Sequence, residues 1–507
     1  MFHGAAITGD WSRPVPLRSL DEFRKKYGTY SPDGSITYEY VAGILSAGLP
    51  VLFQRIACKD QADVQWINGS AIVSQDTPKA EQASYIYSHI TAGDVEQTDL
   101  KISEKWGGTY GNKMTVCIRS SNNVYWMDIK YNGVVVEKVK LITFTGNESA
   151  IEKKRKFIDV LNKTEFNKII VEVLCPIDIQ TGEYDYDKFQ IPSSEDDMPL
   201  AGGTDFDEDL IKDEIPNMYK LIEDKVLYLP KFITSGGYTD ISSSSEIGDA
   251  MKELTLVRQD CRALIDLPLG TLRESYQIEA NKYGYSQLAS TTPIPSASMF
   301  GPWMYMQIGN DQIWMPPSFA YLTVVGGAVS KGEKVYTPKA GLVSGRVSNI
   351  IKPEFEIGSD ICSLWQSEGK LQINPIMRLQ TNDFVIAGNS TLLRIDEDEV
   401  NAFSESSVDL AVIEIRRFVY NLATELQYQY NNASAFEKFS IRTSTYFNGM
   451  EKQGTIADYA IANVSTDDDP RTLKIKVNVL VTPTIKAVEI YLNVAYGSVT
   501  LNAGGEV

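Results

Sequence analysis

The stretch EIGDAMKELTLVRQDCRALIDLP, residues 246–268, decides the fold class because a predicted helix and a predicted strand follow each other within it. Residues 246–260 have a helical pattern, whereas the apolar run at 261–268 is typical of a buried strand. The neighbouring segments continue the alternation: a strand at 225–230, a helix at 271–284 and a strand at 300–308. Such an order predicts an α/β architecture with parallel strands.

The first 60 residues repeat this rhythm on a smaller scale. GAAITG, residues 4–9, is predicted to be a short strand. Ser19, with Glu22 three positions later, forms a capping box that opens a helix, and Gly28 ends that helix. The pattern then predicts a helix at 38–45 and a buried strand at 49–57.

Residues 61–200 are predicted to be an insertion of mainly β structure. Apolar and polar residues alternate through 112–144, and Asn132-Gly133 is a strong signal for a hairpin turn. The acidic segment at 193–216 follows, and its composition predicts a solvated linker between domains.

The C-terminal part combines long helices with terminal strands. Apolar residues at three- and four-residue steps predict a helix at 408–430, and a shorter helix is predicted at 434–447. Residues 473–481 and 488–494 alternate as half-buried strands do, and a third extended piece lies at 498–501. Because an unpaired strand leaves backbone groups without hydrogen bonds, these pieces need partners within the subunit or in a neighbour.

Composition excludes several classes of function. With 507 residues and a formal net charge of −18, the chain is expected to form two to four domains and to repel nucleic acid. No stretch is apolar enough to span a membrane, and we expect no signal peptide. The five cysteines are widely spaced, which indicates reduced, buried thiols. The two histidines, His3 and His89, are expected to be structural or solvated, with His89 at a helix end or in a loop.

No motif for catalysis, metal binding or cofactor binding survives inspection. GGAVSKGEK spaces its glycines like a phosphate loop, but Glu333 stands where the lysine is required, so a loop is expected there. The acidic run that begins at Asp205 resembles a calcium loop, but Leu210 and Pro216 replace the required glycine and glutamate. We therefore expect no catalytic residue, metal or cofactor.

The order of the motifs along the chain resembles that of the tail sheath proteins of contractile-tailed bacteriophages. The matching pieces are Ser19-Leu20, Glu22-Phe23, Gly28, Arg55, KWGGTYGN (105–112), LAGGTD (200–205), RALIDLP (262–268), Pro302-Trp303, MPPSFAYLTVV (315–325, expected as strand), YTPKAG (336–341), QINPIMRLQTNDFVIAGNSTL (372–392), IEIRRFVYNLA (413–423) and LVTPTIKAVEIYLNV (480–494). Each motif is weak alone, but their collinearity along most of the chain is specific.

The resemblance implies a multidomain α/β and α+β fold, a mixed-sheet sheath core with a subtilisin-like middle domain and an inserted β-sandwich or barrel-like domain. The expected division is a strand–helix segment at 1–60, an inserted outer domain at 61–200, the middle domain at 201–368 and a C-terminal sheath domain at 369–507. Because residues 201–368 contain no histidine, a serine-protease triad cannot form within the middle domain. We therefore expect a structural protein, not an enzyme.

In function, the resemblance implies a late structural protein of the virion. Such subunits polymerise as stacked hexameric rings around the tail tube and contract to drive the tube through the host envelope for genome ejection. The implied partners are other copies of the chain, the tail tube protein, and baseplate and tail-terminator proteins. Assembly is expected in the host bacterial cytoplasm, without direct contact with nucleic acid or insertion into a membrane.

Two sets of residues are candidates for contacts. Strand exchange between subunits, which the family uses, points to Ile7, Val488, Ile490, Leu492, Val494, Val499 and Leu501, with an intramolecular hairpin as the plain alternative. A polar surface that releases the tube on contraction points to Glu437, Lys438, Arg442, Glu451, Lys452 and Asp458, with an ordinary solvated helix face as the alternative.

Three other functions compete with this interpretation. The nearest is the sheath of a bacteriocin or another contractile injection system, although a single large chain with an insertion favours a phage. A hydrolytic enzyme with an acidic active site would need carboxylates that converge in a cleft. A capsid or tube protein would not require the middle α/β domain.

Overall fold

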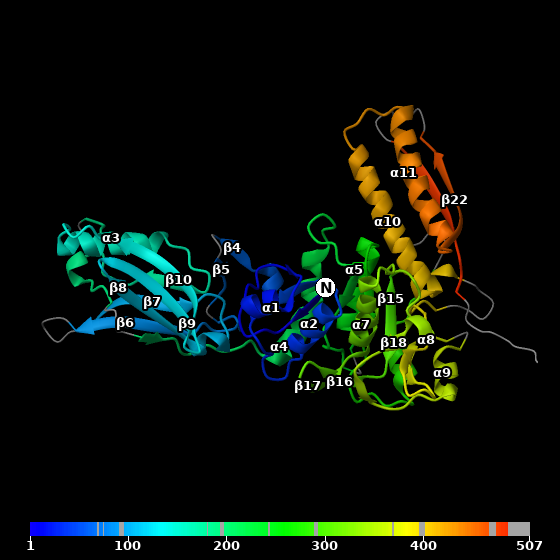
Figure 1. Ribbon diagram of the computed structural model, residues 1–507, viewed down its shortest axis with the longest axis horizontal. Helices are drawn as coiled ribbons and strands as arrows, with labels where there is room; N and C mark the ends of the chain where they lie inside the picture. The colour runs from blue at the N-terminus through cyan, green and yellow to red at the C-terminus, as the bar shows by residue number, and fades with distance from the viewer. Residues whose placement is uncertain are drawn as a thin grey trace, which may run out of the picture. The chain divides into compact units, whose positions relative to one another are not determined.

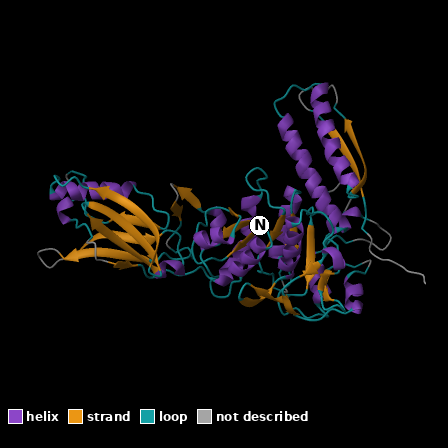
Figure 2. Ribbon diagram, viewed as in Figure 1, coloured by secondary structure: helices purple, strands orange, loops and turns teal. Residues whose placement is uncertain are grey.

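The computed structural model describes residues 1–67, 70–74, 76–90, 96–179, 181–192, 197–241, 244–287, 293–367, 370–394, 401–465 and 473–484. The chain divides into two compact units, Met1–Glu425 and Leu426–Val507. The ribbon in Figure 1 traces the elements of each unit, and Figure 2 separates their helices from their strands. Each unit is described by itself below.

The first unit contains a six-stranded sheet, called the central sheet below, with the order β13-β14-β15-β20-β21-β18; Figure 1 labels its strands β15 and β18. The first four strands are parallel and the last two pairings are antiparallel, which confirms the predicted parallel core. The strands are β13 Phe232–Thr234, β14 Arg262–Ile265, β15 Ala297–Gly301, β20 Asn374–Arg378, β21 Phe384–Ile386 and β18 Arg346–Val347.

Helices pack beside this sheet. Apolar residues of α4 and α5 share one buried cluster with Ala263 and Ile265 of β14, which explains why the stretch at 246–268 specifies a helix followed by a strand. The helices of this part are α4 Glu208–Met218, α5 Glu246–Arg258, α6 Tyr276–Ala280, α7 Pro317–Ser330, α8 Gly341–Ser344, α9 Ser359–Trp365 and α10 Ser406–Leu426. A further sheet, β17-β16-β19, consists of Asp311–Met315, Met304–Ile308 and Ile350–Pro353.

The predicted strand at 225–230 is wrong, because the segment is an irregular turn. Arg258 donates hydrogen bonds to the carbonyl groups of Asp224 and Tyr228, at 3.0 and 2.6 Å. These bonds replace a strand ladder, and Val226 of the turn is 78% exposed. The strand itself begins two residues later, at Phe232.

Three other predictions for this part need correction. The segment at 315–325, expected as strand, opens the helix α7, because Pro317 at the first helical position has a backbone φ suited to a helix start. The segment at 300–308 is two strands in different sheets, β15 and β16, and the helix predicted at 271–284 is shortened to α6 and a 3-10 turn. Gly327, expected in a loop, lies in α7.

The acidic segment is not simply a solvated linker, because its last nine residues, 208–216, belong to α4 and residues 197–199 form β12. Asp207 caps the helix by accepting a hydrogen bond from the Asp209 N–H at 2.9 Å. Ile211 and Ile215 lie one turn apart and are fully buried, so one face of this acidic helix joins the core. Because the segment is rich in acidic residues, its apolar periodicity was not recognised from the sequence.

The N-terminal segment forms its own sheet, in which β1 Phe2–Gly4 pairs parallel and β2 Val15–Leu17 pairs antiparallel with β3 Val51–Arg55. The helices α1 Leu20–Tyr27 and α2 Thr37–Ser46 confirm the two helices predicted there. Ser19 caps α1, although the Glu22 carboxylate accepts from the Arg18 N–H rather than from Ser19. The strand predicted at 4–9 is wrong beyond Gly4, because residues 5–9 are irregular and buried.

Apart from the two-stranded pair β4-β5, the region predicted as an insertion (the inserted region below) contains two sheets around a separate buried cluster. One has the order β10-β9-β8-β12 and the other β11-β7-β6, and α3 Ala150–Lys163 packs against the edge strands β10 and β11 (Figure 1). Asn132 and Gly133 both have positive φ in the β9–β10 hairpin, as predicted. The strands are β4 Gln65–Ile67, β5 Ser70–Ile72, β6 Ser84–Ile90, β7 Glu96–Glu104, β8 Met114–Ser121, β9 Val124–Tyr131, β10 Val134–Thr143, β11 Ile169–Val173 and β12 Asp197–Pro199.

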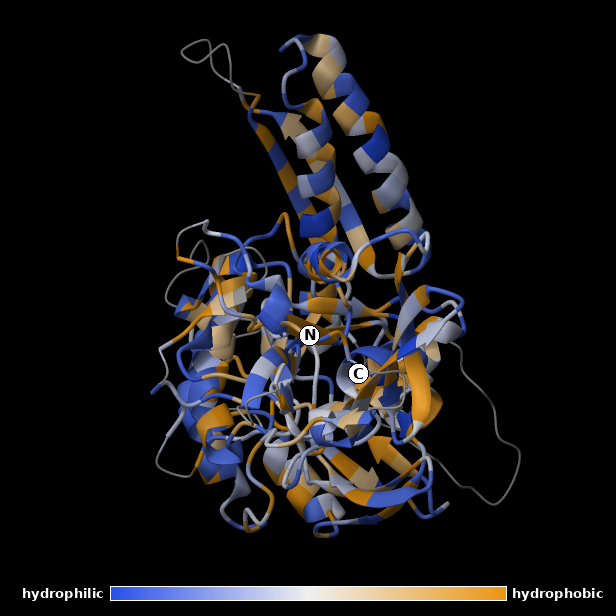
Figure 3. Ribbon diagram, turned by 90° about the vertical axis from the view of Figure 1, so that its left-hand side faces the viewer, coloured by the Kyte–Doolittle hydropathy of each residue, from blue (hydrophilic) through white to orange (hydrophobic). Residues whose placement is uncertain are grey.

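The second unit contains α11 Ala433–Lys452 and a two-stranded antiparallel sheet of β22 Ile456–Asn463 and β23 Ile475–Val481. The helix α11 is longer than the predicted 434–447, whereas α10 ends at Leu426 rather than at residue 430. Both helices are banded by hydropathy, as amphipathic helices are (Figure 3). Phe447 of α11 packs on Tyr459 of β22, with ring centroids 5.1 Å apart.

Candidate functional site: two buried junctions and a two-stranded sheet

The first junction lies where the chain enters the inserted region, around the guanidinium of Arg55. Arg55 ends β3 and is 1% exposed. Its nitrogens donate to four backbone carbonyls, those of Ala6 and Gly9 in the N-terminal segment and of Trp106 and Gly107 in the inserted region, at 2.8 to 3.1 Å. One side chain thus fastens two parts of the chain that are far apart in sequence.

Glu104 supplies the negative charge beside this guanidinium. Its carboxylate accepts hydrogen bonds from the Thr8 hydroxyl at 2.7 Å and from the backbone N–H groups of Trp106 and Gly107. Burial raises the pKa of Glu104, while these donors and Arg55 act in the opposite direction. Nearly every polar atom of the junction therefore has a partner, as a rigid buried site requires.

The segment in which the chain leaves the inserted region, residues 200–205, packs at the same junction. The amide of Asn112 donates to the Gly203 carbonyl and accepts from the Gly203 N–H, at 2.7 and 2.8 Å. The Asp205 carboxylate accepts from both the N–H and the hydroxyl of Thr109. A Cβ on Gly203 would lie 2.4 Å from the Gly108 carbonyl, so this close approach requires glycine. The segments KWGGTYGN and LAGGTD are therefore two halves of one clasp.

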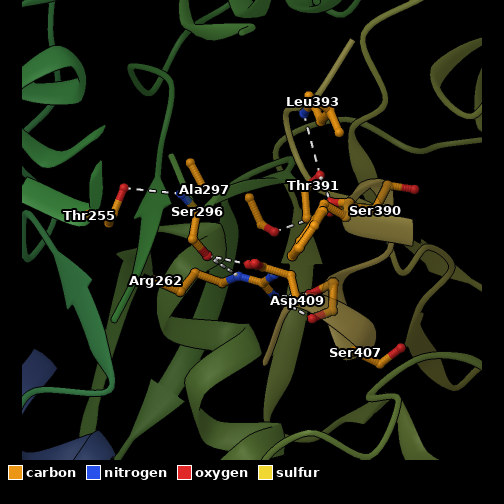
Figure 4. A network of polar contacts seen from close by, with 12 residues as sticks. Thr255, Arg262, Ser296, Ala297, Ser390, Thr391, Leu393, Ser407 and Asp409 are labelled. Carbon is orange, nitrogen blue, oxygen red and sulfur yellow. Dashed lines mark hydrogen bonds and ion pairs between the residues drawn. The ribbon is translucent and has the colours of Figure 1, made fainter. Parts of the chain in front are cut away.

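The second junction holds the first turn of α10 to the central sheet (Figure 4). Arg262 of β14 forms an ion pair with Asp409 of α10 at 2.5 Å and donates to the Ser406 carbonyl at 2.8 Å. Ser296 donates its hydroxyl to the same carboxylate, and its N–H bonds the Thr255 hydroxyl at 3.0 Å. The Arg262 side chain is 0% exposed, so the pair is fully enclosed.

Further along α10, Arg417 repeats this attachment. Its guanidinium donates to the carbonyls of Asp260 and Pro230, at 2.8 and 2.6 Å. Glu414 pairs with Lys231 at 2.8 Å. The helix α10 is thus bonded to the rest of the first unit at its first turn and again between Glu414 and Arg417.

Neither histidine belongs to a catalytic arrangement among the described residues. His3 is fully buried against Tyr219, and burial lowers the pKa of His3 to about 3. His89 lies in the strand β6, which corrects its expected position in a loop or helix end. Its Nδ1 is 2.6 Å from a carboxylate oxygen of Asp99, which occupies a bulge in β7.

The six candidates for tube contact are all exposed, but they do not form one cluster. Glu437, Lys438 and Arg442 lie in the first half of α11, whereas Glu451 and Lys452 lie in its last turn. At about 1.5 Å per residue, Glu437 and Lys452 are roughly 22 Å apart along the helix. Asp458 is on β22.

The sequence analysis did not identify an exposed apolar residue, Ile441, that lies among the polar candidates on α11. Ile441 is 67% exposed and lies between the polar candidates, four residues after Glu437 and three after Lys438. Tyr428 and Tyr430, between α10 and α11, are fully exposed. An isoleucine on the polar side of the helical pattern was the signal that could have identified this surface.

The candidates for strand exchange divide into two groups. Val488, Ile490, Leu492, Val494, Val499 and Leu501 lie outside the described residues. Ile7 is 0% exposed within its own chain, and its carbonyl accepts from the Tyr110 N–H at 3.4 Å. In this conformation Ile7 stabilises its own subunit. The strand predicted at 473–481 completes the subunit's own sheet as β23.

The sheet β22-β23 is open at both sides among the described residues. Its strands pair with each other through seven residue pairs, and no third described strand joins them. Each outer edge therefore carries backbone groups that can accept a further strand. Elsewhere in the described ranges there is no group of three or more His, Cys, Asp or Glu suited to a metal ion. No helix within those ranges has the length and apolar character needed to cross a membrane.

Comparison with known proteins places the chain by fold. No protein-family model matches it, and no curated protein is similar to it in sequence. Among solved structures, the sheath tail protein of Listeria innocua is similar over 95% of this chain and 94% of its own, with a TM-score of 0.59 and 11% identity. The sheath tail protein of Desulfitobacterium hafniense covers 95% of both chains, with a TM-score of 0.54 and 11% identity. This chain therefore has the fold of sheath tail proteins.

Proposed function

We propose that this protein is the structural subunit of a contractile phage tail sheath. The observation that carries the proposal is the similarity to two sheath tail proteins along 95% of the chain. The collinear motifs support it independently, because they lie at the structural junctions: Arg55, KWGGTYGN and LAGGTD all meet in one clasp. Assembly as stacked hexameric rings around a tail tube follows as part of the proposal.

The proposed mechanism needs rigid subunits that swing without separating. Buried charges at both junctions support rigidity within the first unit, since a broken ion pair would leave an uncompensated charge in the interior. The open sheet β22-β23 supports a joint between subunits, because a strand from a neighbour can pair along its edge by β-augmentation. Backbone hydrogen bonds of this kind tolerate rotation and require little sequence specificity.

In this proposal, contraction releases free energy stored at assembly, drives the tube through the host envelope and requires no nucleotide. The helix face around Ile441 supports a contact with the tube, since an apolar centre with screened polar neighbours can bind and still release. The division at residues 60, 200 and 368, the inserted outer domain and the subtilisin-like middle domain belong to the same proposal. So do baseplate and tail-terminator partners and assembly in the bacterial cytoplasm.

Imaging of the purified full chain by negative-stain electron microscopy tests this function. A truncation that ends at Thr484 keeps β23 and removes the proposed exchange strand, and a variant with Val488 and Ile490 both changed to Asp keeps the full length. We expect hollow cylinders from the full chain and discrete subunits from both variants. Cylinders from all three proteins would retain the sheath and exclude the terminal joint, whereas discrete subunits from the full chain would contradict the proposal.

A further inference from the structure

The solvent-exposed face of the sheet β10-β9-β8 has an unusual composition. Arg119 of β8, Trp126 of β9 and Lys140 of β10 lie directly opposite one another across the three strands. Lys138, two residues from Lys140 on the same face, places its ammonium 5.6 Å from the centre of the Trp126 ring. Three cations thus surround one indole, and we call these four residues the Trp126 face.

These cations are available for contacts outside the subunit. Arg119 remains 53% exposed although it pairs with Asp128 at 3.2 Å, and Lys138 and Lys140 are exposed. Asp128 lies on the same side of the sheet, two residues from Trp126 and opposite Lys138, and is only 3% exposed, so it compensates one of the three charges and adds little negative surface. The Trp126 face therefore has a net positive charge.

This charge opposes that of the rest of the chain, which has 66 acidic and 48 basic residues. Two copies of a subunit with a net charge of −18 repel each other at long range. A basic face offers a local contact that opposes this repulsion, because the chain as a whole carries more carboxylates than cations. Charge complementarity thus favours a second copy as the partner.

The residue types point to a protein partner as well. Tryptophan and arginine are the residues that most often anchor protein–protein interfaces. Nucleic acid also prefers cations and aromatic rings, but the overall negative charge opposes a densely charged phosphate backbone. We propose that the Trp126 face of one subunit binds a carboxylate-rich surface of a second copy of this chain. The inference rests on the proposed sheath function and extends it to a contact made by the inserted region.

The test compares the full-length protein with the double variant K138E/K140E, which leaves the residues Arg119 and Asp128 themselves unchanged. The matched control R155E/K163E makes the same change in net charge on exposed positions of α3 in the same region. Assembly is measured as the fraction that sediments, between 50 and 500 mM NaCl, and circular dichroism checks that each variant is folded. A second variant, W126A, removes the aromatic anchor without changing charge.

We expect the wild-type protein to assemble less as salt rises, because screening weakens the contact. K138E/K140E should sediment at least tenfold less at 50 mM NaCl and lose its salt dependence, while R155E/K163E behaves as wild type. Assembly of K138E/K140E at wild-type levels would overturn the inference and leave the sheath function standing. Failure of the wild-type protein to assemble at any salt concentration would overturn both. Binding of a thymidine oligonucleotide to wild type but not to K138E/K140E, with assembly unchanged, would replace the inferred partner with a polyanion.

Discussion

The first turn of α10 and the sheet β22-β23 differ in how their polar groups are satisfied. At the α10 junction, Arg262 and Asp409 are enclosed and bonded by residues of the same chain. Among the described strands, the sheet β22-β23 pairs only with itself, and no described strand occupies its outer edges. The first region is complete within one subunit, whereas the second has capacity for a partner.

This difference suggests that the two regions have different roles: the α10 junction makes the subunit rigid, and the sheet β22-β23 is suited to assembly. A buried ion pair tolerates little displacement, because both charges lose their compensation when it breaks. An open strand edge tolerates many partners, because its ladder is made of backbone groups. We therefore expect mutations at the junctions to change the stability of the isolated subunit, and mutations at the open sheet to change assembly.

The largest effect is expected for Asp409→Ala, which leaves the Arg262 guanidinium buried and unpaired. We expect a loss of about 3–5 kcal/mol in the free energy of unfolding, measured by chemical denaturation. Replacement of both partners, as in R262M/D409L, should recover much of that loss. The exposed pair of Arg273 and Glu274 provides the control, since its removal should cost less than about 1 kcal/mol. Equal effects at the two pairs would contradict the distinction.

The next effect is expected for Arg55→Met, which keeps an unbranched stem but lacks the guanidinium and so removes all four carbonyl contacts. Because the carbonyls and Glu104 would lose their partner, we expect a cost of about 2–4 kcal/mol. Limited proteolysis should cleave between residues 80 and 110 faster than in wild type, while α10 remains protected. If proteolysis between residues 80 and 110 were no faster than in wild type, the contacts of Arg55 would not be needed to keep this junction folded.

A third test uses pH on the buried carboxyl of Asp266, which accepts from the N–H and hydroxyl of Ser318. Burial raises the pKa of Asp266 to about 7. Since the unfolded chain releases this proton near pH 4, folded stability should fall as pH rises from about 4 to about 7. Asp266→Asn removes this dependence, so its stability relative to wild type should increase by on the order of 2 kcal/mol between pH 5 and pH 8. A constant difference across this range would contradict the raised pKa.

The smallest effect on stability is expected in the second unit, for Asn432→Ala. Asn432 caps α11 by accepting from the Ala435 N–H at 3.1 Å, and its loss should cost about 1 kcal/mol. Circular dichroism of the purified full chain would detect the change in melting. Ser149→Ala, which removes the capping box of α3, is the matched control in the first unit. A much larger loss for Asn432→Ala would indicate that the sheet depends on α11 more than its own pairing suggests.

Where local pattern and tertiary environment agreed, the sequence predicted the fold well. The helix and strand within 246–268, the Ser19 cap and the Asn132-Gly133 hairpin all appear in the structure. The predictions at 225–230 and 193–216 failed for opposite reasons. The first segment is apolar but is held as a turn by arginines from elsewhere, and the second is acidic but hides an apolar helical face.

The sequence by itself determined the α/β pattern, the long amphipathic helices, the acidic charge and the collinear motifs, because each follows from the residue types and their order along the chain. Only the tertiary structure decided that KWGGTYGN and LAGGTD form one clasp, that Arg262 meets Asp409, and that Arg119, Trp126 and Lys140 share a row. These contacts join residues from about 7 to about 150 positions apart. Their formation depends on sheet register and chain topology, which local propensity does not encode.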